Sequence, residues 1–281
     1  MAKVVSLINM KGGVGKSTIT ANIAWHYAAY KTWSKKVLVV DLDPQFNVSQ
    51  YLLGVDKYEK KVYEPQSPTM WDIFEQYSHT PGSVSRGSIN PSAVIQNIVT
   101  FNSGSKIDLI PSRLELSYSL KNPAQKELLL DDFLSKVDSN YDLIIIDCPP
   151  TESLLTISAY LSSDYVLVPV KPEFLSTVGL PLLAQSISDF NNQYQRMLTI
   201  AGIVFNGATN YSPEEIKSKT EVHDIAKKNE WYVFENSIRY SRSYPKGARE
   251  GRPIFWTSYA RTDVANEFAG FAKELAQRIG L

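Results

Sequence analysis

The segment KGGVGKST at residues 11–18 constrains this chain more than any other feature. It lies between a short β-rich run, Val4–Ile8, and a run with helical character, Ser17–Tyr30. Glycines allow successive backbone N–H groups to turn toward one anion, and the N-terminus of the helix that follows adds positive potential. A strand, a glycine loop and a helix in this order therefore predict a loop that binds the phosphates of a nucleotide.

The loop is a deviant form of the usual phosphate-binding pattern. The strict pattern G-x-x-x-x-G-K-[ST] needs glycine where this chain has Met10, and the chain instead carries an extra lysine at Lys11. We expect Lys16 to reach the terminal phosphates and the Ser17 hydroxyl to bind Mg²⁺. The residues predicted to bind the nucleotide are Lys11, Gly12, Gly13, Val14, Gly15, Lys16, Ser17 and Thr18.

Short apolar runs alternate with helical patterns along most of the chain. Charges, Pro or Gly bound each apolar run, which favours strands buried on both faces of a sheet. The expected strands are Val4–Ile8, Val37–Val40, Ile107–Ile110, Leu143–Ile146, Tyr165–Pro169 and Ile200–Phe205. The expected helices are Ser17–Tyr30, Glu115–Lys136, Leu154–Ser163, Gly179–Asn191, Glu214–Asn229 and Val264–Ile279. The pattern predicts an α/β fold with a doubly wound, mostly parallel sheet and helices on both faces.

The chain is expected to form a single domain over residues 1–281. Of its 281 residues 43% are hydrophobic, which is enough for one large buried core. Residues 55–106 depart from the alternation and are rich in Tyr, Pro, Ser and Gly. We interpret them as an elaborated connection with a short helical piece near Met70–Tyr77, because they carry too few apolar residues for a core of their own.

Three aspartates directly follow expected strands. Asp147 comes after Leu143–Ile146, and Asp41 and Asp43 come after Val37–Val40. The carboxyl ends of parallel strands meet at one edge of a sheet, here beside the glycine loop. Asp147 is therefore the candidate that holds Mg²⁺ through water, and one of Asp41 and Asp43 is the candidate that orients an attacking water. An aspartate after a strand is also often only a helix cap, so the choice between these two stays open.

Composition excludes several classes of function. The formal net charge is zero, so binding to nucleic acid or to an anionic membrane would need a local patch. Cys148 is the only cysteine, which excludes a disulfide framework, a CxxC zinc site and a cysteine-ligated iron–sulfur cluster within one chain. The histidines His26, His79 and His223 lack metal-ligand spacing. With no leader-like segment and no apolar run long enough for a bilayer, we expect a cytoplasmic location.

Three segments together resemble the ParA/MinD family of deviant Walker A P-loop ATPases. They are KGGVGKST at 11–18, DLDPQ at 41–45 and DCPP at 147–150. The resemblance is closest to ParA and continues through residues 166–179 and 239–254. It covers nearly the whole chain, with residues 55–106 the least similar part. No helix-turn-helix segment precedes the loop, as in the Soj-like members, so operator binding is not implied.

The resemblance implies ATP and Mg²⁺ as cofactors and a sandwich homodimer with two ATP molecules at its interface. Lys11 stands at the signature-lysine position, which reaches the partner's phosphates. Asp43 resembles the residue that positions water, and Asn206 the residue that reads adenine. Ser17 stands where most relatives have Thr, and Thr151-Glu152 replaces the usual small residues after the double proline. The second departure puts the detail of the switch in doubt.

Residues 236–252 form a candidate DNA-binding loop. Their basic residues are Arg239, Arg242, Lys246, Arg249 and Arg252, against a single acid at Glu250 within the span 239–252. A basic loop neutralises backbone phosphates without reading bases. A charge run is more often a solvated face, but the family places DNA-contacting basic residues here. The expected partner is therefore non-specific double-stranded DNA, with the protein associated with the nucleoid.

The sequence as a whole predicts an ATP-fuelled, dimeric DNA-binding switch that partitions plasmid, chromosome or other cargo. By resemblance, ATP hydrolysis is weak until a ParB-like activator stimulates it. The alternative is a membrane-surface regulator of the MinD type. The helix Val264–Ile279 argues against it, because its charges balance and its apolar positions suit core packing. A nitrogenase-reductase-like role lacks the cysteines, and a tyrosine kinase would carry clustered C-terminal tyrosines.

Overall fold

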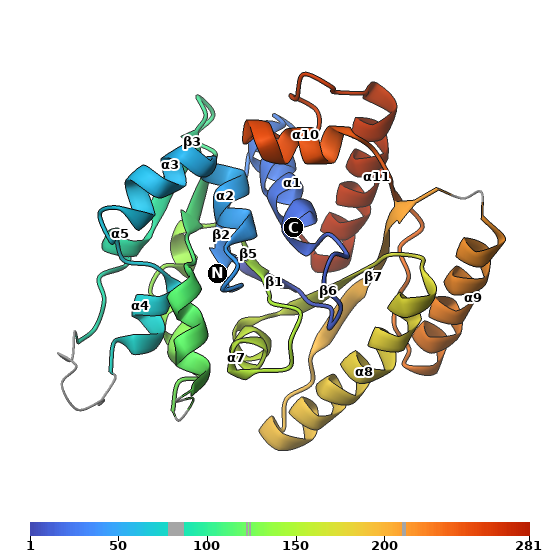
Figure 1. Ribbon diagram of the computed structural model, residues 1–281, viewed down its shortest axis with the longest axis horizontal. Helices are drawn as coiled ribbons and strands as arrows, with labels where there is room; N and C mark the ends of the chain where they lie inside the picture. Colours follow the sequence, from blue (N-terminus) through green and yellow to red (C-terminus); the bar gives the residue numbers. More distant parts are fainter. Residues whose placement is uncertain (78–86, 122, 124, 210–211) are drawn as a thin grey trace.

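The computed structural model describes residues 1–77, 87–121, 123, 125–209 and 212–281, and its centre is one eight-stranded sheet (Figure 1). The strand order is β3-β4-β2-β5-β1-β6-β7-β8. Every neighbouring pair is parallel except β3 with β4, which is antiparallel. The strands are β1 Lys3–Leu7, β2 Lys36–Asp41, β3 Gln96–Thr100, β4 Lys106–Ile110, β5 Leu143–Asp147, β6 Tyr165–Val170, β7 Thr199–Ala208 and β8 Ile238–Arg239.

All six strands expected from the sequence are present, so the α/β, mostly parallel prediction is confirmed. The sequence missed the two strands at the sheet edges. β3 is half exposed along its length and reads QNIVT, without a continuous apolar run. β8 is only two residues long. Strands that are not buried on both faces lose the compositional signal on which the prediction rested.

Helices cover both faces of the sheet (Figure 1). Four expected helices are confirmed as α1, α7, α9 and α11, and the fifth, Gly179–Asn191, lies inside α8. The α-helices are α1 Lys16–Ala29, α2 Asn47–Leu53, α3 Val55–Tyr58, α4 Met70–Glu75, α5 Pro91–Val94, α6 Leu129–Leu134, α7 Leu154–Ser162, α8 Phe174–Tyr194, α9 Pro213–Lys228, α10 Ser243–Glu250 and α11 Thr262–Ile279.

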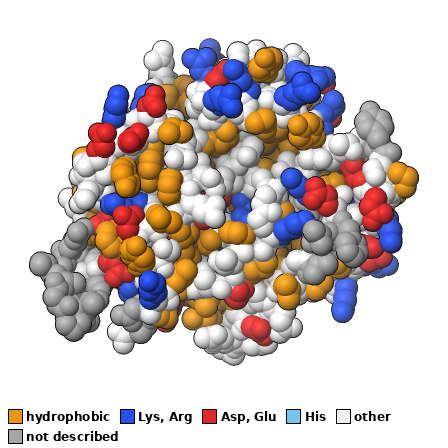
Figure 2. Space-filling view, viewed as in Figure 1, with side chains coloured by type: hydrophobic (Ala, Val, Ile, Leu, Met, Phe, Trp, Pro, Cys, Tyr) orange, Lys and Arg blue, Asp and Glu red, His pale blue; other side chains and the backbone are white. Residues whose placement is uncertain are grey.

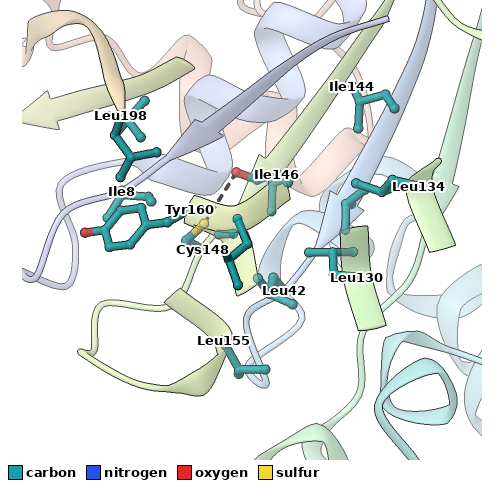
Figure 3. Close-up of a cluster of buried hydrophobic side chains, with 14 of the residues drawn as sticks. Ile8, Leu42, Leu130, Leu134, Ile144, Ile146, Cys148, Leu155, Tyr160 and Leu198 are labelled. Atoms are coloured by element: carbon teal, nitrogen blue, oxygen red, sulfur yellow. Dashed lines mark hydrogen bonds between the residues drawn. The ribbon is translucent and has the colours of Figure 1, made fainter. Parts of the chain in front are cut away.

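Two hydrophobic cores form because the side chains of each strand alternate between the two faces of the sheet. In β2, Leu38 and Val40 pack into one core, with α6, α7 and α8, whereas Val37 and Val39 pack into the other, with α1 and α11. Figure 3 shows part of the first core, where Cys148 lies among apolar side chains of β5, α6 and α7. At about 25 cal/mol per Å² of buried apolar surface, these two layers supply the main stabilisation of the sheet.

The predicted helix Glu115–Lys136 is wrong. The structure has a 3-10 helix, Leu114–Lys121, and then the short α6, Leu129–Leu134. Pro123 lies between them, and proline cannot donate a backbone hydrogen bond and disfavours helical geometry in the residue before it. The apolar pattern is real, since Leu116, Leu130 and Phe133 are all buried, but two separate short helices present it.

Residues 55–106 carry more regular structure than the sequence indicated. They contain α3, a π-helix at Glu59–Tyr63, α4, α5 and β3. The short helix expected near Met70–Tyr77 is confirmed as α4, with a capping box between Thr69 and Asp72. Met70, Ile73 and Phe74 join the main core rather than a separate one. The division into one domain stays a prediction.

The last helix, α11, packs its apolar face against the sheet, as expected. Val264, Phe268, Phe271, Leu275 and Ile279 are each at most 1% exposed. No described helix is both long enough and apolar enough to cross a bilayer.

Candidate nucleotide site

The glycine loop connects the end of β1 to the start of α1, as the sequence predicted. Gly13 and Gly15 have φ angles of 74° and 94°, which are accessible to glycine at little cost. Gly15 is the residue that precedes α1, and no side chain caps the backbone N–H groups of that helix. The first residues of α1, Lys16, Ser17 and Thr18, line the cavity described below, which suits this helix N-terminus to an anionic phosphate.

Lys16 lies at the centre of the loop and is only 7% exposed. Its Nζ donates hydrogen bonds to the backbone carbonyls of Asn9, at 3.1 Å, and Lys11, at 3.3 Å. Burial lowers the pKa of Lys16, while the nearby Asp147, Cys148 and Asp43 act in the opposite direction. The loop thus holds its cation on neutral carbonyl dipoles, where phosphate oxygens could replace them as stronger partners.

The sheet register brings the predicted acidic residues to the same edge. Asp147 pairs with Asp41 across β5 and β2, and with Leu7 across β5 and β1. Because the glycine loop begins just after Leu7, Asp147 lies directly beside it. This confirms that parallel strand ends collect these residues, as expected from the sequence.

Asp147 is fully buried, and neither of its carboxylate oxygens has a hydrogen-bond partner. Burial raises the pKa of this carboxyl, while the nearby charge of Lys16 acts in the opposite direction. The Thr20 hydroxyl is likewise buried without a partner. Buried polar oxygens left unpaired are costly, so the arrangement suits a cation or an ordered water.

Mg²⁺ fits this set of donors. It favours oxygen ligands and usually keeps several waters and substrate phosphates in its coordination sphere, so one hydroxyl and one nearby carboxylate are sufficient. Ser17 and Asp147 provide these two groups. Among the described residues no cluster of three or more His, Cys, Asp or Glu could hold a metal alone. His79 lies outside the described residues.

Asp41 and Asp43, which the sequence could not separate, have different environments. Asp41 is completely buried, and its carboxylate accepts hydrogen bonds from the Ser49 N–H and hydroxyl and from the Asp43 N–H. Burial raises the pKa of Asp41 well above its usual value. Asp43 accepts one bond, from the Gln45 N–H at 2.9 Å, and lines the cavity. Asp43 is therefore the aspartate in position to contact a ligand.

A cavity of about 530 Å³ unites the loop with α2 and α10. The sequence missed its lining residues from α2, although Asn47, Gln50 and Tyr51 have the spacing of one helix face. Its lining residues are Gly12, Gly13, Gly15, Lys16, Ser17, Thr18, Asp43, Gln45, Asn47, Gln50, Tyr51, Val55, Pro150 and Ala248.

A larger cavity, of about 870 Å³, lies on the other side of Val55 and is lined by Trp25, Ile98 and Arg252 among others. It contains no residue of the glycine loop and none of the three aspartates. The smaller cavity is therefore the candidate nucleotide site on chemical grounds.

Lys11 and Asn206 make contacts that the sequence did not reveal. Lys11 Nζ lies 3.6 Å from a Glu173 carboxylate oxygen, and the Lys11 N–H donates to Asn9 Oδ1. Asn206 Nδ2 donates to the Val14 carbonyl at 2.7 Å, so this amide connects β7 to the glycine loop. Contact of Asn206 with adenine stays a prediction.

The basic segment at 236–252 is mostly ordered structure, so the expected loop is wrong. It forms β8 and then α10. Basic side chains gather over α10 and the segment that leads to α11 (Figure 2). The sequence pattern did not indicate this helix, because its Pro245 and Gly247 are poor helix formers.

The basic residues of this segment fall into two groups. Arg239 is paired with Glu267 and Asp263 of α11, and Lys246 with Glu250 one turn along α10. Arg242, Arg249 and Arg252 are exposed, and within the described part of the chain no carboxylate forms an ion pair with them. These three arginines are available to an external anion.

The model of the AAA_31 family, described as an AAA domain, matches residues 2–200. The chromosome-partitioning ATPase Soj of Treponema pallidum is 28% identical over 284 residues, which cover 100% of this chain and 99% of that protein. Among solved structures, apo McdA of Cyanothece matches with a TM-score of 0.78 and 21% identity over 98% of this chain and 99% of that chain. A putative plasmid partition protein from Borrelia burgdorferi, bound to AMPPNP, matches with a TM-score of 0.72 and 22% identity, covering 98% and 100% of the two chains.

Proposed function

Because this chain belongs to the ParA/MinD family of P-loop ATPases, we propose that it binds DNA as an ATP-dependent dimer and releases it when a partner protein stimulates hydrolysis. Its family and a relative named for chromosome partitioning make it a ParA-like positioning ATPase. The observation that carries the proposal of DNA binding is one cavity that joins the glycine loop, Asp43 and the basic helix α10.

The loop residues would bind ATP through its phosphates. Gly12, Gly13 and residues 15–18 line the cavity, and their backbone N–H groups with the Lys16 ammonium would complement the negative charge of a triphosphate. Ser17 and, through water, Asp147 would hold Mg²⁺, which would offset the negative charge that develops in phosphoryl transfer. Asp43 would orient the attacking water, because it is the aspartate that lines the cavity.

Lys11 would act across a dimer interface. It is partly exposed at the rim of the loop, with its side chain 25% exposed and a 3.6 Å contact to the more exposed Glu173. A surface ion pair of this kind is worth about 1 kcal/mol or less, so a partner's phosphate can displace the carboxylate. Dimerisation would then depend on bound ATP, since only the triphosphate provides the full negative charge.

DNA would bind to the exposed arginines of the basic segment. Arg242, Arg249 and Arg252 would contact backbone phosphates, with Arg239 and Lys246 nearby but already paired with carboxylates. Two such patches on a dimer give avidity, which a monomer lacks. The protein would thus reside on the nucleoid in its ATP form. The membrane alternative lacks support, because the apolar face of α11 is buried.

The experiment is a salt series of DNA binding by fluorescence anisotropy, on two unrelated duplexes, with a non-hydrolysable ATP analogue and with ADP. Binding with the analogue should be equal on both duplexes and should weaken with salt, by about −0.9 in log–log slope for each neutralised phosphate. Arg242→Glu should weaken binding to both sequences alike. Binding to anionic vesicles with no binding to either duplex would overturn the proposal.

A further inference from the structure

Asn22 is a completely buried amide that lies one turn after the glycine loop. Its Nδ2 donates to the Thr18 carbonyl, at 2.8 Å, and lies 3.0 Å from the Tyr51 hydroxyl. Its Oδ1 accepts from the Ile254 N–H at 2.9 Å. One side chain therefore links the start of α1, the helix α2 and the segment that follows α10.

Tyr51 extends this link to the basic segment. Its hydroxyl accepts from Asn22 and donates to the Arg252 carbonyl at 3.2 Å. Burial raises the pKa of Tyr51, so the hydroxyl stays protonated and able to donate at any ordinary pH. Tyr51 is also one of the residues that line the nucleotide cavity. The same side chain therefore contacts both the cavity and the backbone of a DNA-binding candidate.

The helix α10 is packed tightly at this point. A Cβ atom on Gly247 would lie 2.8 Å from the Tyr51 hydroxyl and 2.6 Å from the Arg252 carbonyl oxygen. The next residue, Ala248, lines the nucleotide cavity. Tyr51 and α10 therefore cannot move closer together at Gly247, and such close-packed contacts transmit shifts from one element to the other.

We propose that Asn22 and Tyr51 are positioning residues that make the placement of α10 and its arginines depend on the nucleotide in the cavity. This proposal rests on the function proposed above, and it identifies the residues that connect the nucleotide cavity to the basic segment. A nucleotide contacts the loop, Tyr51 and Ala248. The hydrogen bonds of Tyr51 to Arg252 and of Asn22 to Ile254 then make the position of this segment depend on the bound nucleotide. Coupling between two sites changes affinity by about 5- to 150-fold in typical cases, and this link carries a measurable share of it.

The main variant is Tyr51→Phe, which removes only the hydroxyl. Calorimetry on each variant sets the concentrations at which the ATP analogue and ADP saturate the protein, so that DNA binding is compared at equal nucleotide occupancy. The ratio of DNA affinity with analogue to that with ADP should fall by about tenfold. Tyr58→Phe is the matched control, because the Tyr58 hydroxyl is also buried and donates to one backbone carbonyl, that of Ser112, at 2.8 Å. It should leave the ratio unchanged.

A second readout separates this inference from the DNA-binding proposal. Hydrogen–deuterium exchange of the amides in residues 243–254 should slow when the analogue binds to wild type and to Tyr58→Phe, but not when it binds to Tyr51→Phe. Asn22→Asp, which keeps the acceptor for Ile254 but loses both donors, should behave like Tyr51→Phe. Nucleotide-dependent protection in Tyr51→Phe equal to that of wild type would overturn the inference, whether or not the protein binds DNA.

Discussion

Asn206 leaves room only for a hydrogen atom at Gly15. A Cβ atom on Gly15 would lie 2.1 Å from Asn206 Nδ2, the same nitrogen that donates to the Val14 carbonyl. The φ angle of 94° at Gly15 also excludes most other residues. Two independent constraints therefore select glycine at this position, one from the backbone and one from a strand almost two hundred residues away in the sequence.

Gly15→Ala should therefore abolish nucleotide binding while the rest of the sheet stays folded. The added methyl group displaces the Asn206 amide or the loop, and the N–H groups no longer converge on the phosphates. Calorimetry with ATP and Mg²⁺ measures the loss. In the double variant Gly15→Ala/Asn206→Gly the contact is removed but the backbone strain remains, so only partial recovery is expected. ATP affinity of Gly15→Ala equal to that of wild type would show that the loop can adapt to a side chain at this position.

Lys11→Ala should keep nucleotide binding in the monomer but lose ATP-dependent dimerisation. Its charge lies at the rim of the loop, whereas Lys16 lies within it, so the two lysines should separate experimentally. Size-exclusion chromatography with a non-hydrolysable analogue checks this. Glu173→Gln is the matched control, because it breaks the ion pair but leaves Lys11 in place, and it should dimerise at least as well as wild type. A Lys11→Ala protein that dimerises normally would make this lysine a bystander.

Asp41→Ala and Asp43→Ala should fail in different ways. Asp41→Ala leaves the buried Ser49 and Asp43 donors unpaired, so the free energy of unfolding should fall by about 2 kcal/mol or more. Asp43→Ala loses one bond near the surface of the cavity and should stay close to wild type in stability, while turnover falls by roughly a hundredfold. Chemical denaturation and a phosphate-release assay measure the two. Equal turnover in Asp43→Ala and wild type would transfer the water-orienting role to Asp41.

The stability of the protein should fall as the pH decreases from about 6.5 to about 4, because of His26. Burial lowers the pKa of His26 from 6.5 to about 4 in the folded protein, among Tyr30, Trp33 and Phe268. Below pH 6.5 this histidine binds a proton in the unfolded chain but stays neutral in the folded protein. The free energy of unfolding therefore falls by about 3 kcal/mol by the time the pH reaches 4. Above pH 6.5 this contribution is fully present.

Urea denaturation at several pH values tests the effect, with His26→Phe as the comparison. The variant lacks the titrating group, so the difference in unfolding free energy between wild type and variant isolates His26 from the carboxyl groups that titrate nearby in pH. Parallel stability curves for the two proteins between pH 4 and pH 6.5 would show that the ring is protonated freely in the folded state.

The sequence could predict what depends on local pattern, and it failed where distant segments decide. The central strands were predictable because burial on both faces produces continuous apolar runs, such as Leu143–Ile146 within β5. The positions of Asp41 and Asp147 followed from the rule that parallel strand ends meet. The pairing of Arg239 with Glu267 could not be predicted, because β8 and α11 meet only in the folded chain.

Within the site, the loop residues were predictable and their surroundings were not. The spacing of glycines and lysines specifies phosphate binding almost by itself. The contact of Asn206 with Val14 depends on the register between β6 and β7, which no local pattern encodes. Ser49 distinguishes Asp41 from Asp43 as the candidate that orients water. Its N–H and its hydroxyl both donate to the Asp41 carboxylate, whereas Asp43 lines the cavity. A serine one turn into the following helix gave no signal of this in the sequence.

Neither edge strand of the sheet, β3 or β8, is suited to pair with a strand of another chain. β8 is two residues long, and the ladder between β3 and β4 shifts its register between Asn97 and Val99. Short or bulged edge strands offer few aligned N–H and C=O groups to a newcomer, whereas long flat ones promote open-ended stacking. The two edge strands therefore disfavour irreversible aggregation of this chain by strand pairing. In the proposed function, association of two copies would use loops and helix surfaces instead, and it would end as soon as the nucleotide departs.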